Sequence, residues 1–184
     1  TGVQTCALPI LSQPAEAVST EITQLHHYIN GTQVAGSSGR FGDVFSPSRG
    51  VKISETPLAS QSEVEAAIAV AEAAFPAWAA TSVLQRSRIM ARYVQLLYKH
   101  QHELATLVST EHGKVIEDAM GSVLRGIEVA EFACGAPHAQ KGEFSDNVAR
   151  GIDIYSMRKP LGVVAGITPF NFPAMIPLWM AGMA

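Results

Sequence analysis

Hydrophobic and polar positions divide the chain into a strand-rich first part, a helical middle and an extended end. Between residues 26 and 58, short apolar pieces alternate with turn residues, and Asn30-Gly31 separates two of them in a pattern typical of a β-hairpin. A second strand pair is predicted in "FGDVFSPSRGVKI", with Pro47 to Gly50 as its turn. We therefore expect paired strands before residue 60.

From Ser60 the apolar spacing changes to three and four residues, which predicts helices. Ser60 and Glu63 match a capping box, an apolar stripe continues to Phe75, and Pro76 is expected to limit this first helix. Three further helices are predicted, from Ser82, from Gln101 to Gly113, and from Val115 to Cys134. Because their outer faces are polar, we interpret them as ordinary amphipathic cover.

The last part of the chain returns to extended structure. Residues 142 to 160 alternate in polarity and predict an extended, partly exposed hairpin with Gly151 in its turn. The segment from Val163 to Ile167 is apolar on both faces, as expected for a strand in the middle of a helix-covered parallel sheet. A loop over 168 to 172 follows, and Pro173 is expected to open a helix.

Residues 162 to 184 contain no charged residue and are long enough to cross a bilayer. Pro169, Pro173 and Pro177 stand four apart, however, and each removes a helical hydrogen bond that nothing in lipid would replace. We therefore favour strand, loop and helix over a membrane span. Ligands of parallel sheets bind beyond the carboxyl ends of strands, which places Asn171 at the mouth of a site. An ordinary turn residue is the alternative for Asn171.

Composition narrows the class of protein. A hydrophobic fraction of 47% is enough for a core, and a net charge of -3 argues against nucleic acid or anionic lipid as partners. Cys6 and Cys134 make no disulfide framework, so a reducing, cytosol-like compartment is expected, with Cys134 as a small buried residue. Neither histidines nor cysteines have metal-binding spacing, so no metal site is expected.

Gly113 in "EHGK" is interpreted as a helix C-cap.

The first 25 residues do not fit the globular pattern. They contain neither the basic start of a secretory signal nor the arginines of a mitochondrial presequence. We interpret residues 1 to 25 as a non-native or disordered leader.

Four motifs follow one another in the order found in a known family. They are "INGTQVAGSSGR", "FPAWA", "EHGKVIEDAMGSVLRGIEVAEFACG" and "MRKPLGVVAGITPFNFP". Together they resemble the aldehyde dehydrogenase superfamily, and the "ITPFNFP" form is similar to the CoA-acylating methylmalonate-semialdehyde dehydrogenases. The resemblance covers about residues 26 to 184.

The resemblance implies an α/β fold, namely the N-terminal part of the aldehyde dehydrogenase fold. Residues 26–141 and 161–184 would form an incomplete Rossmann-like NAD-binding domain, and residues 142–160 would form a β-hairpin of the oligomerisation domain. The catalytic domain would be absent.

By the same resemblance, Asn171 contributes to the oxyanion hole, and Ile167, Thr168, Pro169 and Phe170 line the NAD side of the loop. An asparagine suits the first role because its amide NH2 donates to a developing oxyanion without titrating near neutral pH.

The implied reaction is NAD-dependent oxidation of methylmalonate or malonate semialdehyde, with coenzyme A as acyl acceptor, in a homo-oligomer (dimer or tetramer). Two alternatives stay open: a non-acylating aldehyde dehydrogenase, and a non-catalytic assembly partner. Neither Cys6 nor Cys134 matches the family's nucleophile, so we expect the isolated chain to be inactive.

Overall fold

The computed structural model describes residues 22–184, so most of the expected leader lies outside the described residues. The remainder of that leader is partly ordered. Strand β1 (Thr23–Gln24) pairs in parallel with β5 (Val51–Pro57), with Thr23 opposite Ser54. Ordered structure therefore begins before His26, earlier than the sequence pattern predicted.

The strands before residue 58 form a three-stranded sheet and a hairpin. In the sheet, β4 (Phe41–Ser46) lies antiparallel to β5, in the order β1-β5-β4. The hairpin joins β2 (His27–Ile29) to β3 (Thr32–Val34). Its two turn residues, Asn30 and Gly31, have φ angles of 52° and 74°, the left-handed pair that a two-residue turn requires. Both predicted strand pairs are confirmed.

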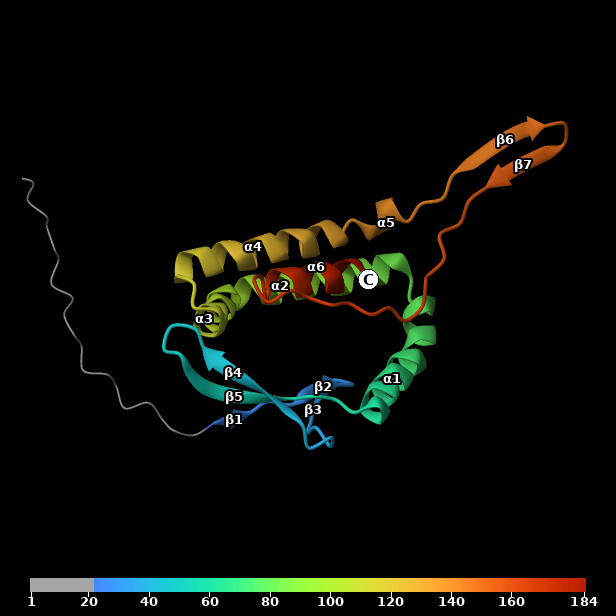
Figure 1. Ribbon diagram of the computed structural model, residues 1–184. Helices are drawn as coiled ribbons and strands as arrows, with labels where there is room; N and C mark the ends of the chain where they lie inside the picture. Colours follow the sequence, from blue (N-terminus) through green and yellow to red (C-terminus); the bar gives the residue numbers. More distant parts are fainter. Residues whose placement is uncertain (1–21) are drawn as a thin grey trace, which may run out of the picture.

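Helices make up most of the packed structure (Figure 1). In chain order they are α1 (Gln61–Ala80), α2 (Val83–Lys99), α3 (Gln101–His112), α4 (Ile116–Ala133), α5 (Ala136–Ala139) and α6 (Met175–Met183). Helix α4 contacts α2, α3 and α6, and the buried core gathers along it. That core consists of Val94, Leu97, Ala105, Val108, Ala119, Val123, Ile127, Ala130 and Leu178.

Helix α1 differs from expectation in two ways. It continues through Pro76 to Ala80, and none of its side chains is buried. An interior proline removes one donor, so the carbonyl of Glu72 loses its helical partner; Glu72 is exposed, which allows water to replace that partner. The helix was interpreted as amphipathic cover, but Val64 and Ile68 of its apolar stripe are both nearly half exposed.

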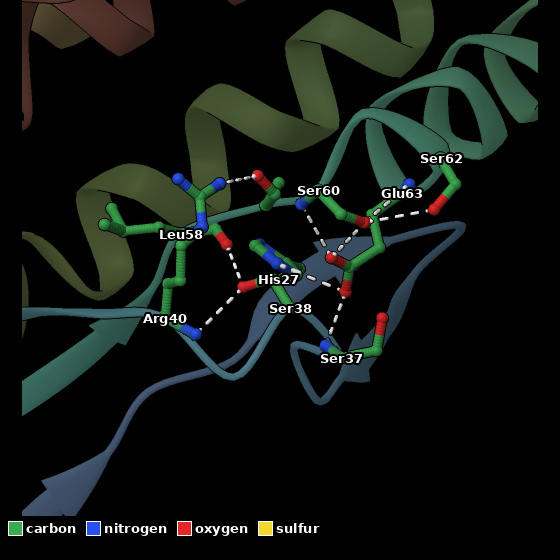
Figure 2. A network of polar contacts seen from close by, with 9 residues as sticks. His27, Ser37, Ser38, Arg40, Leu58, Ser60, Ser62 and Glu63 are labelled. Carbon is green, nitrogen blue, oxygen red and sulfur yellow. Dashed lines mark hydrogen bonds and ion pairs between the residues drawn. The ribbon is translucent and has the colours of Figure 1, made fainter.

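The start of α1 is fixed by the carboxylate of Glu63 (Figure 2). It accepts hydrogen bonds from the backbone N–H of Ser60 at 2.8 Å and of Ser37 at 2.6 Å. His27 Nε2 lies 4.0 Å from the same carboxylate. The Ser60 and Ser37 donors lower the pKa of Glu63 from 4.5 to about 2. The predicted capping box is confirmed, and it also joins the β3–β4 loop to the helix.

A second hairpin projects away from the helices (Figure 1). Strands β6 (Phe144–Ala149) and β7 (Ile152–Tyr155) pair antiparallel, and Gly151 turns between them at a φ of 75°. The predicted hairpin is confirmed, but every residue of both strands is exposed, where the alternating pattern predicted only partial exposure.

The expected strand at residues 163–167 is not formed. This segment has no strand partner among the described residues, and Val164 and Ile167 are more than half exposed. A strand needs a neighbouring strand to pair its backbone groups, and residues 163–167 belong neither to the three-stranded sheet nor to either two-stranded hairpin. The mixed α/β class is confirmed, but the parallel Rossmann-like sheet is not present in residues 22–184.

Within residues 22–184, no single helix has both the length and the apolar character to cross a bilayer. Helices α1 and α2 meet that test only when counted together, and they are bent by 114° at their junction.

Candidate functional site

The predicted site loop, residues 168–172, connects the extended segment to α6. Asn171 is exposed, and its side chain makes no hydrogen bond to the part of the chain that the structure describes. Ile167 and Phe170 are 92% and 96% exposed. Phe170 and Asn171 form a turn, and residues 164–169 before it have no regular secondary structure. The predicted site residues therefore lie in one exposed stretch of chain.

Helix α6 holds the loop from its C-terminal side, by packing closely on α4. At Gly126 of α4, a Cβ atom would lie 2.6 Å from Leu178 Cδ1 and 3.3 Å from the Cα atom of Met175. The absence of a side chain at Gly126 therefore favours this close approach of the two helices. The indole N–H of Trp179 adds a hydrogen bond of 3.1 Å to the carbonyl of Arg125.

Lys114 holds the loop from its other side. Its ammonium nitrogen lies 5.0 Å from the ring centroid of Phe172, the neighbour of Asn171. The same nitrogen lies 2.8 Å from Oδ2 of Asp118 and 3.4 Å from the hydroxyl of Ser122, both on α4. This hydrogen-bonded lysine lowers the pKa of the Asp118 carboxyl.

Sequence reasoning identified Gly113 but missed Lys114. Gly113 is the left-handed C-cap of α3, with a φ of 83°, so that prediction is confirmed. Lys114 precedes α4, whose N-cap is Val115, so the i,i+4 rule for two helical residues did not indicate its ion pair with Asp118. The contact with Phe172 could not be read from spacing, because 58 residues separate the two side chains.

Cys134 stands apart from this arrangement. It is partly buried at the C-terminal end of α4, where its Sγ lies 3.5 Å from the carbonyl of Ala130. Its fixed partner gives it no evident means of activation. Among residues 22–184, no three His, Cys, Asp or Glu side chains gather in a way that could hold a metal ion.

Two open grooves lie beside the extended segment and not at Asn171. One, of about 470 Å³, runs between the end of α1 and residues 158–164. The other, of about 420 Å³, lies between the apolar stripe of α1, strand β2 and residues 163–164. Val164 lines both grooves.

The arrangement offers one kind of chemistry. Asn171 presents an uncharged NH2 donor on a loop held at both ends, by α6 and by Lys114. A donor of this kind stabilises negative charge that develops on an oxygen atom.

Comparisons with known proteins place this arrangement among relatives. The model of a family described as the aldehyde dehydrogenase family matches residues 34–184. The malonate-semialdehyde dehydrogenase of Pseudomonas aeruginosa is 52% identical over 160 residues, which are 87% of this chain and 32% of that protein. The human mitochondrial, acylating methylmalonate-semialdehyde/malonate-semialdehyde dehydrogenase is 44% identical over 170 residues, 92% of this chain and 32% of that protein.

A solved structure agrees with these sequence matches. A protein of Sinorhizobium meliloti, described as a methylmalonate-semialdehyde dehydrogenase and solved with NAD, superposes with a TM-score of 0.84 at 49% identity. The superposition covers 87% of this chain and 33% of that one. The chain thus spans about a third of the length of the relatives it matches.

Proposed function

The chain belongs to the aldehyde dehydrogenase family, and on that basis we propose that it is the part of a CoA-acylating malonate- or methylmalonate-semialdehyde dehydrogenase that carries the oxyanion donor. The observation that supports this most is the exposed side chain of Asn171 in "TPFNFP", on a loop whose next residue, Phe172, contacts Lys114. Identities of 52% and 44% to proteins named for these two semialdehydes support the substrate class.

Asn171 would act on the substrate aldehyde. When a nucleophile adds to the carbonyl carbon, the carbonyl oxygen takes up negative charge, and the Asn171 NH2 donates a hydrogen bond to it. The amide is uncharged throughout, so its donor capacity does not change with pH near neutrality. The nucleophile would come from the other two thirds of such an enzyme.

Residues 167–170 would form one wall of the NAD site. They fit this role because the side chains of Ile167 and Phe170 are almost fully exposed and can cover an apolar ring face. NAD, when bound, supplies the hydride acceptor. The contribution of this chain is to line that site and to exclude water from it.

The hairpin β6–β7 would serve assembly of a homo-oligomer. Four of its apolar side chains, Phe144, Ile152, Ile154 and Tyr155, are each more than half exposed. Its strand edges are also free within the described residues, and an exposed edge is a template for pairing with another chain.

A chimera tests the proposal. Residues 26–184 replace the matching third of the Pseudomonas aeruginosa enzyme, and NADH formation is measured with malonate and methylmalonate semialdehydes, with and without coenzyme A. We expect turnover that yields acyl-CoA and depends on coenzyme A. A folded chimera without turnover would contradict the proposal.

The role of Asn171 is tested in the same chimera. We expect Asn171→Ala to lower kcat by about 100- to 1,000-fold, the usual effect of removing one oxyanion donor. Asn30→Gly is the matched control, because Asn30 lies in the β2–β3 turn at a φ that glycine adopts freely. A kcat for Asn171→Ala within twofold of the control would exclude the oxyanion role.

A further inference from the structure

Lys114 is held in place before it reaches the site loop. It directly follows the C-cap Gly113, and its carbonyl accepts a hydrogen bond of 2.7 Å from the hydroxyl of Ser109. Only 11% of its side chain is exposed. An ordinary surface lysine keeps its ammonium group in water. Lys114 instead directs its ammonium group inward, against the first turns of α4.

Three neighbours surround that ammonium group. Asp118 and Ser122 are on α4 itself, and the hydroxyl of Ser122 also donates to the carbonyl of Asp118 at 3.0 Å. The third neighbour, Phe172, belongs to the loop that carries Asn171. A cation over an aromatic face attracts the ring, and the attraction is stronger where water is partly excluded. Lys114 thus joins α4 to the site loop.

The backbone of the loop is held by local contacts. Phe170 and Asn171 form a turn, and a backbone hydrogen bond of 3.4 Å runs from the N–H of Ile176 to the carbonyl of Phe172. Because Phe172 directly follows Asn171, a contact that holds the Phe172 ring also restricts the backbone of Asn171.

We propose that Lys114 is a positioning residue for Asn171, acting through the ring of Phe172. This inference rests on the proposed function, because it assigns Lys114 to the same oxyanion site. Lys114 does not contact the substrate; it fixes the loop so that the Asn171 amide is aimed before the aldehyde binds. A displacement of about 1 Å in such a group can cost about 100-fold in rate.

The first test measures the contact in the 184-residue chain itself by NMR. A ring face shifts protons above it upfield, so we expect the ε-methylene protons of Lys114 to be upfield of other lysines and to return to the ordinary position in Phe172→Leu. We expect Lys114→Met to shift the side-chain NH2 resonances of Asn171, and the exposed control Lys99→Met to leave them unchanged. Unshifted Lys114 protons, or an unchanged Asn171 signal in Lys114→Met, would overturn the inference.

The second test separates positioning from stability in the chimera described above. We expect Lys114→Met to lower kcat by about 10- to 100-fold while KM for NAD stays within about twofold. Lys114→Arg keeps a cation over the ring and should recover most of the kcat. If Lys114→Met is as active as its parent, or if Lys114→Arg is as impaired as Lys114→Met, the positioning role is refuted.

The two tests also separate this inference from the proposed function. An inactive chimera with Lys114 intact would count against the dehydrogenase function alone. The NMR experiment needs no activity, so it would still decide whether Lys114 controls the position of Asn171.

Discussion

The close packing of α6 on α4 predicts different effects for two alanine substitutions on one helix. Gly126 and Gly121 both lie in α4. A Cβ atom at Gly121 would have only Arg125 Nη2 as a neighbour, at 4.0 Å. A Cβ atom at Gly126 would lie 2.6 Å from Leu178 Cδ1, 3.2 Å from Leu178 Cβ and 3.3 Å from Met175 Cα. Carbon atoms pack best at about 3.5–4.0 Å, so only the second position is overfilled.

The magnitudes follow from two terms. Replacing a helical glycine by alanine gains about 1 kcal/mol in helix propensity at either position. At Gly126, overpacking costs about 1–3 kcal/mol, because the Cα atom of Met175 and the Cβ atom of Leu178 cannot rotate away as the Leu178 methyl group can. We therefore expect Gly121→Ala to raise the free energy of unfolding. The Gly126→Ala variant should be less stable than the Gly121→Ala variant by about 1–3 kcal/mol.

Urea unfolding followed by far-UV circular dichroism measures this difference, with thermal unfolding as a second readout. For a chain of this size, each kcal/mol corresponds to a Tm shift of about 2–4 °C. Equal stabilisation by the two alanines would refute the reasoning, since it would mean that α6 does not pack against Gly126.

Two further predictions concern the helix starts. Because the folded pKa of Glu63 is about 2 and its ordinary value is 4.5, the stabilisation from its carboxylate is complete above pH 4.5 and is lost as the pH falls toward 2. We expect Glu63→Gln to lower the urea midpoint at pH 7 and to weaken the dependence of that midpoint on pH between 4.5 and 2. The control Glu72→Gln, at an exposed position of the same helix, should have neither effect. Identical pH profiles for Glu63→Gln and the unchanged chain would contradict this account. Ser82→Ala removes the side chain that accepts from the N–H of Gln85 at 3.3 Å, and should cost about 1 kcal/mol in the same urea assay; no measurable cost would mean that this cap does not hold α2.

Local signals predicted local structure well. The turn at Asn30-Gly31, the capping box at Ser60 and the C-cap at Gly113 each depend on residues within four positions of one another, and all three are confirmed. Helix α4 was predicted to within one residue at each end, because its apolar period is continuous from Ile116 onward.

What the sequence did not predict depends on distant partners. The apolar run from Val163 to Ile167 has the composition of a buried strand, but pairing needs a neighbouring strand, and none is present in residues 22–184. The pattern also gave no hint that Pro76 would be accommodated, since that depends on the exposure of a carbonyl one turn earlier.

The candidate site divides in the same way. Its motif, "TPFNFP", and the exposure of Asn171 could be foreseen from residues 162–184 alone. The contact between Lys114 and Phe172 could not, because it forms only when α6 has brought the loop against α4.

The pairing of α4 with α6 also sets an order of events during synthesis on the ribosome. Trp179 and Arg125 are 54 positions apart in the sequence, so the face of α4 around Gly126 is synthesised well before α6, the helix that covers it. At about 5–20 residues per second, that face waits roughly 3–10 s for α6. Helices α2, α3 and α4 can associate in this interval, because their contacts are local. The small residues of α4 then leave little apolar area open to capture by another nascent chain.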